Sequence, residues 1–110
     1  MTLSVKSFDV VVVPIPTSEG VAPRPALVVT SDAHRRTGHV IVAMITSVDD
    51  QMPGDVDIIN WADIGLPKPS KVRTAKLATF DISSLQRRLG SIDPEAQAAV
   101  RTYLRQFIDA

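Results

Sequence analysis

V-A-P-R-P-A-L-V-V-T-S-D, residues 21–32, joins a strand pattern to one charged side chain held between two prolines. The apolar run 26–30 is short and rich in valine, which predicts a buried β-strand. Arg24 precedes this run; Pro25 restricts it to extended backbone angles, and Pro23 limits the approach of the chain. An always-charged guanidinium with five donors thus stands on a stiffened backbone at the mouth of a strand. Arg24 is therefore either an anion-binding residue or an ordinary strand-end arginine, and its local sequence favours neither.

Short apolar runs and turn residues divide the rest of the chain into strands and loops. Valine-rich or alternating segments predict five further strands, at residues 9–14, 39–46, 56–59, 71–74 and 77–82. Prolines, glycines and polar residues predict loops at 15–24, 31–38 and 48–55, and one helical turn within 60–67.

The C-terminal segment has the pattern of an amphipathic helix. Asp93 can cap its N-terminus, Pro94 suits the first helical position, and Glu95 places a negative charge in the first turn. The apolar residues at helical spacing are Ala96, Val100, Tyr103, Leu104, Phe107 and Ile108. We expect this stripe to pack on the sheet. Several short strands and one terminal helix predict a strongly curved sheet or small β-barrel with a C-terminal helix.

Composition indicates one small globular domain covering residues 1–110, since 45% of the chain is hydrophobic and the formal net charge is zero. No global positive field is available for nucleic acid, although a local one is not excluded. The chain has no cysteine, which fits a reducing compartment. No signal-peptide pattern opens the chain, and no apolar run approaches the ~20 residues that span a bilayer. We expect a soluble cytoplasmic protein.

The charges are distributed unevenly. Residues 37–67 contain no Lys or Arg but five aspartates, whereas residues 67–76 contain four basic side chains and no acid. These segments are either two loops of opposite sign that partly neutralise each other, or a basic strip for a phosphate backbone beside an acidic flank. Composition alone favours the first interpretation.

The common catalytic and metal-binding motifs are missing from the sequence. His34 and His39, the only histidines, have no carboxylate at ligand spacing, so we expect surface histidines, no metal and no cofactor. The sequence has no G-x-S-x-G motif, no Gly-rich phosphate loop and no evident Ser–His pairing. The remaining polar candidates lie near predicted strand ends: Arg24, Thr46, Ser47, Arg73, Thr74 and Lys76. Arginines with hydroxyl groups could bind a phosphate, but for Thr74 and Lys76 the spacing favours ordinary strand-end polarity.

Four ordered blocks of the chain resemble the PemK/MazF-like toxins of type II toxin–antitoxin systems. The blocks are D-V-V-V-V-P-I-P-T, R-P-A-L-V-V-T-S-D-A, V-I-V-A-M-I-T-S and L-P-K-P-S-K-V-R-T-A-K-L-A-T-F-D. The resemblance implies a small SH3-like β-barrel (a CcdB/PemK/MazF-like fold) that forms a homodimer. It also implies metal-independent cleavage of single-stranded RNA at a preferred sequence, by attack of a ribose 2′-OH that leaves a cyclic phosphate and a 5′-OH. A cognate antitoxin would bind over the RNA groove.

The same resemblance assigns roles to individual residues. Arg24 and Thr46 match the catalytic arginine and the catalytic threonine or serine of the family. Arg73 matches an arginine implicated in catalysis or RNA binding in the PemK-type branch. The residues expected to bind RNA are Thr17, Ser47, Lys71, Thr74 and Lys76.

Two positions depart from the family pattern. Phe8 stands where the family usually has glycine before the first strand, so we expect an altered backbone near the groove or a contact in the dimer interface. Ala75 stands where the PemK-type branch has an aspartate proposed as the base. These departures keep an alternative open, a catalytically weak toxin-fold protein that binds an antitoxin or, like the CcdB-like branch, DNA gyrase. An SH3-like adaptor is disfavoured because only 5% of the residues are aromatic.

Overall fold

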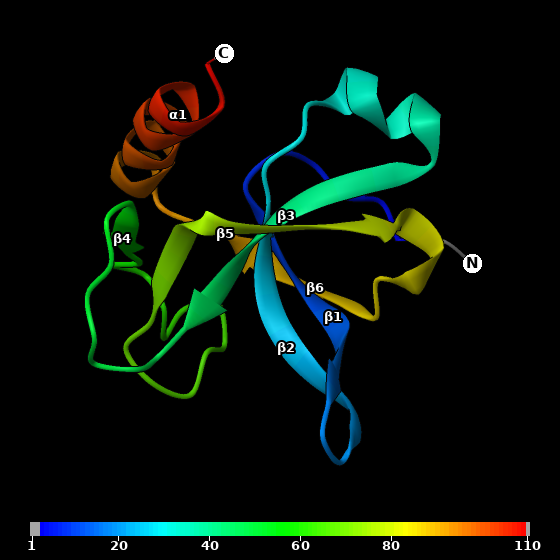
Figure 1. The fold of residues 1–110 in the computed structure, drawn as a ribbon, viewed down its shortest axis with the longest axis horizontal. Helices are drawn as coiled ribbons and strands as arrows, with labels where there is room; N and C mark the ends of the chain where they lie inside the picture. Colours follow the sequence, from blue (N-terminus) through cyan, green and yellow to red (C-terminus); the bar gives the residue numbers. More distant parts are fainter. Residues whose placement is uncertain (1–2, 110) are drawn as a thin grey trace.

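The computed structural model describes residues 3–109 as a mainly β protein with a C-terminal helix (Figure 1). The bounds of its elements are β1 Asp9–Thr17, β2 Gly20–Val28, η1 Asp32–Thr37, β3 His39–Thr46, β4 Asp55–Asp57, β5 Lys71–Asp81, η2 Ile82–Ser84, β6 Arg87–Ser91 and α1 Pro94–Ile108, where η marks a 3-10 helix. The bounds predicted for β3 and the start predicted for α1 are confirmed. Within the described residues, no helix has the length and apolar character needed to cross a bilayer.

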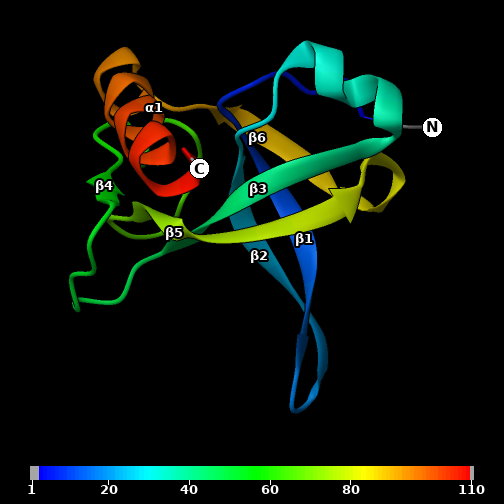
Figure 2. The ribbon, with the colours of Figure 1, turned by 45° about the horizontal axis from the view of Figure 1, so that its top comes forward.

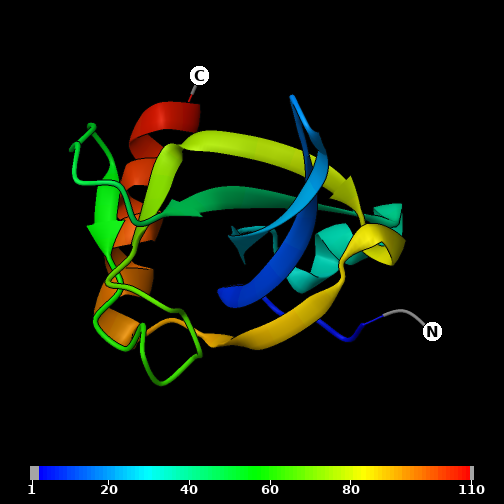
Figure 3. The same ribbon diagram turned by 90° about the horizontal axis from the view of Figure 1, so that it is seen from below.

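The strands form one antiparallel sheet in the order β4-β5-β3-β2-β1-β6. The sheet curves strongly, so that β5 and β6 run along opposite sides of the molecule (Figure 3). The prediction of a curved, barrel-like sheet with a C-terminal helix is confirmed. The two outermost strands, β4 and β6, remain the edges of this sheet.

The prediction of a loop at residues 15–24 is wrong, because these residues form the outer half of a β-hairpin. β1 and β2 pair from Val10 opposite Leu27 to Thr17 opposite Gly20. β3 pairs with β2 only as far as Ala26, so the outer half is a two-stranded ribbon that projects from the sheet (Figure 2). Proline is tolerated there because its missing N–H faces no third strand. The prolines in this ribbon are Pro14, Pro16, Pro23 and Pro25.

Two further differences concern the C-terminal strands. The separate strands predicted at 71–74 and 77–82 are one strand, β5, interrupted by a bulge. On β5, Leu77 stands opposite Ala43 of β3, but the next residue of β3, Met44, stands opposite Arg73. Residues 74–76 therefore have no partners on β3. β6 was not predicted, because R-R-L-G-S has no apolar alternation; β6 forms through its pairing with β1.

Both faces of the sheet are covered. Val10 and Leu27 belong to one apolar cluster, against which helix α1 packs through Ala96 and Val100. Val11 belongs to a second cluster on the opposite face. Successive residues of β1 therefore pack in different clusters. Because both faces of the strand are buried, its sequence is a continuous apolar run.

Phe8 keeps the backbone conformation that glycine favours, with a φ of 68°. Its N–H donates to the Val28 carbonyl at 2.7 Å, and its ring lies in the cluster beneath α1, where the Arg101 guanidinium stands 4.7 Å from the ring centroid. The Phe8 side chain is thus accommodated by the core and α1, and its effect on the groove backbone or on a dimer interface stays a prediction.

Candidate active site

Arg24 lies in the projecting hairpin, opposite Val13 on β1, with an exposed side chain. Its Nη1 donates to the Pro23 carbonyl at 3.1 Å. Within residues 3–109 the guanidinium makes no other hydrogen bond or ion pair. Most of its donors therefore face solvent and are available to an anion.

The pairing of β2 with β3 brings Arg24 close to Thr46. Ala26 pairs with Met44 in this antiparallel ladder, so Arg24 and Thr46 occupy matching positions two residues further along each strand. A hollow of about 360 Å³ is lined by both residues and by Ser47. The structure thus unites three of the residues that the sequence singled out.

This hollow is the middle of three that adjoin one another. The hollow on one side shares Arg24 and also contains Arg87, with a volume of about 270 Å³. The hollow on the other side shares Thr46 and Ser47, reaches Trp61, and has a volume of about 400 Å³. We refer to the residues lining these three hollows as the groove. Its Arg24 end is basic, whereas its Trp61 end carries the carboxylates of Asp49 and Asp57 together with Lys71, one of the residues expected to bind RNA.

Thr46 ends β3 and is half-buried, with its hydroxyl tied into the turn that follows. The backbone N–H of Val48 donates to Thr46 Oγ1 at 3.3 Å. An oxygen that accepts this bond still carries its own hydrogen to donate. The local turn therefore fixes the hydroxyl oxygen while its O–H remains able to bind a phosphate oxygen.

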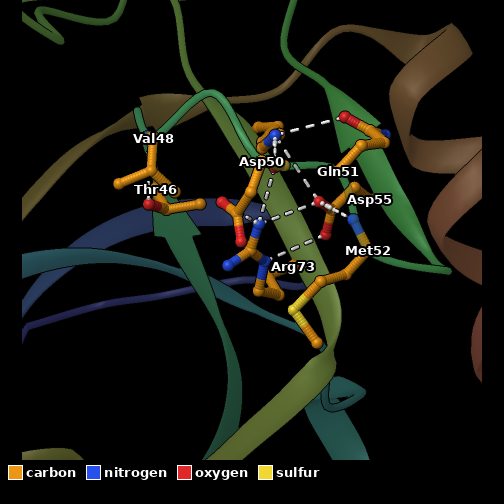
Figure 4. A network of polar contacts seen from close by, with 8 residues as sticks. Thr46, Val48, Asp50, Gln51, Met52, Asp55 and Arg73 are labelled. Atoms are coloured by element: carbon orange, nitrogen blue, oxygen red, sulfur yellow. Dashed lines mark hydrogen bonds and ion pairs between the residues drawn. The ribbon is translucent and has the colours of Figure 1, made fainter.

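Arg73 does not line the groove; it belongs to a buried ion-pair network (Figure 4). Its Nε donates to Asp55 Oδ1 at 3.1 Å and its Nη2 to Asp55 Oδ2 at 3.0 Å. Nη2 also reaches the carbonyl of Asp50 at 3.1 Å and Asp50 Oδ1 at 3.2 Å. The Asp55 side chain has no exposed area, and that of Arg73 is 12% exposed. In this conformation Nε and Nη2 of Arg73 are bound by acceptors of its own chain.

Lys71 belongs to the same network. Its Nζ lies 3.6 Å from Asp55 Oδ2 and donates to Gln51 Oε1 at 3.1 Å and to the Asp50 carbonyl. Its side chain is only 8% exposed. The interpretation that the acidic and basic segments neutralise each other thus holds for these residues, and the pairing is buried.

The network shifts the pKa values of Asp55 and Arg73. Burial raises the pKa of Asp55, but hydrogen bonds from Arg73 and from the Met52 N–H, together with both nearby cations, outweigh burial and leave this pKa below its usual value. The hydrogen bond to Asp55 is the largest influence on Arg73 and raises its pKa. Asp55 and Arg73 therefore form a charged pair at neutral pH.

The other residues expected to bind RNA are placed differently from one another. Ser47 is exposed in the groove. Thr74 is fully buried and its Oγ1 has no partner within the described residues, so the expectation that it lines the groove is wrong. Lys76 is exposed in the β5 bulge, outside the lining of the groove. Thr17 closes the hairpin turn, where its Oγ1 donates to the Gly20 carbonyl at 2.7 Å.

The sequence reasoning missed Asp55, Asp57 and Trp61. Asp55 could have been linked to Arg73 by pairing the two opposite charge runs, but the specific partners depend on the register of β4 and β5, in which Asp55 stands opposite Arg73. Asp57 and Trp61 carry no local signal, since their place in the groove follows from the path of residues 47–70.

A family model and several solved structures are similar to this chain over nearly its whole length. The model of a family described as "PemK-like, MazF-like toxin of type II toxin-antitoxin system" matches residues 6–108. An endoribonuclease in complex with its cognate antitoxin, from a mycobacterial species, is 19% identical, with a TM-score of 0.79 and 96% of each chain covered. The Mycobacterium tuberculosis toxin MazF-mt6 is 22% identical, with a TM-score of 0.75 and coverage of 92% of this chain and 96% of that one. A MazE–MazF structure from Deinococcus radiodurans is 20% identical, with a TM-score of 0.79 and coverage of 97% and 98%. No curated protein sequence matches the chain.

Proposed function

Because the chain belongs to the family of PemK-like, MazF-like toxins of type II toxin–antitoxin systems, we propose that it is an endoribonuclease that cleaves single-stranded RNA. The observation that carries this proposal is the hollow shared by Arg24 and Thr46. A guanidinium with free donors and a fixed hydroxyl at one site suit a phosphodiester. The adjoining hollows give a strand room on both sides of this point.

The reaction we propose needs no metal. The 2′-oxygen of the ribose attacks the neighbouring phosphorus while the bond from phosphorus to the 5′-oxygen breaks. The products are a 2′,3′-cyclic phosphate and a 5′-OH end. The 2′-OH proton passes to solvent water, and the leaving 5′-oxygen takes a proton from water. Arg24 stabilises the negative charge that develops on the phosphoryl oxygens, and Thr46 donates a hydrogen bond to a phosphoryl oxygen. DNA lacks the 2′-OH and is therefore not cut.

We assign catalysis to Arg24 and Thr46 rather than to Arg73. Nε and Nη2 of Arg73 are bound by Asp55 and Asp50, its side chain is 12% exposed, and Ala75 offers no carboxylate to act with it. This assignment makes the pair of β2 and β3 the catalytic scaffold.

The proposal includes two protein partners and a location. One structural relative is described as an endoribonuclease in complex with its cognate antitoxin, and another as a MazE–MazF structure. We propose that this chain likewise forms a homodimer and is inhibited by a cognate antitoxin that covers the groove. Cleavage of mRNA would place it in the cytoplasm.

The test is to incubate the purified protein with a long single-stranded RNA and with DNA of the same sequence, in the presence of EDTA. Mapping of the product ends is expected to show discrete RNA cuts that leave a 5′-OH, and intact DNA. Cuts that vanish with EDTA would overturn the metal-free mechanism. An absence of cuts across RNAs of varied sequence would overturn the nuclease proposal and favour a toxin-fold protein that acts by binding alone.

A further inference from the structure

We propose that Asp55 is a positioning residue of the groove, which fixes the loop of residues 47–54 through Arg73 and Lys71. This inference rests on the proposed ribonuclease function for its catalytic consequence, but its structural content is independent of that function. It gives Arg73 a role through the loop in place of direct contact with the scissile phosphate.

The buried carboxylate is the centre of the network. Both oxygens of Asp55 accept from Arg73 in a two-pronged arrangement, and Oδ2 also accepts from the N–H of Met52 at 2.9 Å. The side chain of Asp55 has no exposed area, so its charge is compensated by these contacts and by Lys71 rather than by water. Removal of this one charge would leave two largely buried cations without their shared counter-ion.

The two cations then hold the loop by its backbone. Lys71 Nζ and Arg73 Nη2 both donate to the carbonyl of Asp50, and Lys71 also binds the Gln51 side chain. Figure 4 shows Arg73 lying between Asp50 and Asp55. The loop is thus held at residue 50 by side chains of β5 and at residue 52 by Asp55 itself.

The same loop begins at the catalytic hydroxyl. Only residues 47–49 separate Thr46 from the anchored Asp50, and the Val48 N–H bonds Thr46 Oγ1. The stretch from Thr46 to Gln51 supplies much of the lining of the Trp61 end of the groove. A loop released from Asp55 would therefore displace both the groove wall and the partner that orients Thr46, and displacements of about 1 Å can cost on the order of 100-fold in rate.

The network contains no exposed cation that would suggest direct phosphate binding. Arg73 and Lys71 have side chains that are 12% and 8% exposed, whereas the Asp50 carboxylate is 64% exposed and faces solvent. A phosphate could bind Nε or Nη2 of Arg73 only by displacing Asp55 or Asp50. The geometry therefore supports an internal clamp.

The experiment compares Asp55→Asn with Asp9→Asn in the full chain. Asp9 is an equally buried aspartate that is bound by an arginine, Arg88, at the opposite edge of the sheet, outside the groove. Hydrogen exchange of the folded proteins is the first readout: Asp55→Asn is expected to raise exchange of the 47–54 amides at least about tenfold, whereas Asp9→Asn leaves these amides unchanged.

Cleavage at saturating RNA is the second readout, normalised to the folded fraction. A misplaced Thr46 weakens an interaction made in the transition state, so Asp55→Asn is expected to lower kcat at least about tenfold. Asp9→Asn is expected to retain kcat. If Asp55→Asn does not fold, Arg73→Lys keeps the charge, removes the two-pronged contact and is subjected to both readouts.

The outcomes separate this inference from the proposed function. Unchanged exchange of the 47–54 amides in Asp55→Asn, or equal losses of kcat in Asp55→Asn and Asp9→Asn, would overturn the positioning role. If the wild-type protein cleaves no RNA, the exchange measurement still decides whether Asp55 holds the loop.

Discussion

At the scale of the residue, the site depends on which charges are free and which are paired. Arg24 and Arg73 are both arginines near strand ends, and the family resemblance assigned Arg24 to catalysis and Arg73 to catalysis or RNA binding. The structure separates them: Arg24 keeps free donors in the groove, whereas Arg73 is bound by Asp55 and Asp50. The difference comes from the acceptors that β4 and the preceding loop place beside Arg73, which are 18 and 23 residues away in sequence.

Gly54 gives a prediction at the same scale. It has a φ of +89°, and a Cβ placed there would lie 2.6 Å from Cε2 of the Phe107 ring on α1. Gly54→Ala is therefore expected to destabilise the fold by about 2–3 kcal/mol, from the positive φ and from the displaced ring. Urea unfolding measures this loss.

Gly38→Ala is the matched control for Gly54→Ala. Gly38 has a φ of +79°, and a Cβ there would meet no atom within 4 Å. The control should show only the backbone cost, about 1–2 kcal/mol. Equal losses in the two variants would mean that the Phe107 ring moves aside without cost, contrary to our account.

At the scale of the element, local signals predicted some structures and tertiary pairing created others. β3 and the start of α1 followed from an apolar run and from the Asp93-Pro94 cap; Asp93 Oδ2 accepts from the Ala96 N–H at 3.0 Å, as the capping pattern requires. The hairpin extension was missed because its prolines were interpreted as loop residues. β6 was missed because its strand character comes from pairing with β1.

Like the fold, the candidate site could be predicted only in part from local sequence. Arg24, Thr46 and Ser47 were recognised because each stands at the end of an apolar run, and the β2–β3 register then unites them. Asp55 and the burial of Thr74 could not be predicted, because they depend on the β5 bulge and on the β4–β5 register. Long-range pairing is not encoded in a local pattern.

The pairing of β1 with β6 gives a prediction about acid stability. Burial raises the pKa of Asp9, but hydrogen bonds from Arg88, the Lys6 N–H and Ser91 outweigh it, so the pKa lies below the ordinary value of 3.8. A lowered folded-state pKa stabilises the protein above the unfolded-state pKa, and this contribution is lost as the pH falls from about 4 through the folded-state value. The pKa of Asp55 is also lowered, so this carboxylate likewise contributes stability that is lost as the pH falls.

Urea unfolding at pH 7 and at pH 3 tests this linkage. Asp9→Asn is expected to cost about 1–3 kcal/mol at pH 7, from lost hydrogen bonds to a charged group, and less at pH 3. Asp63, which is exposed, provides the control substitution Asp63→Asn, expected to have little effect at either pH. A cost of Asp9→Asn that is the same at both pH values would contradict the assigned role of its charge.

At the scale of the whole molecule, one curved sheet performs two tasks. Its centre, where β2 meets β3, brings Arg24 and Thr46 to one hollow. Its β4–β5 edge carries the Asp55 network, and α1 covers that edge through Phe107 against Gly54. The protein thus places the groups proposed to meet the scissile phosphate at the centre of the sheet and the charges that hold the groove in shape at its edge, with Lys71 contributing to both the network and the lining of the groove.

The measurement that tests this account most directly is the single-turnover rate of RNA cleavage by Arg24→Ala, with circular dichroism to confirm the fold. Arg36→Ala serves as the control, since Arg36 is exposed in η1, at the opposite end of β3 from Thr46. We expect folded Arg24→Ala to cleave at least about 100-fold more slowly than the wild-type protein, because an anion-stabilising donor is lost, and Arg36→Ala to retain the wild-type rate. Cleavage by folded Arg24→Ala at the wild-type rate would contradict the central claim.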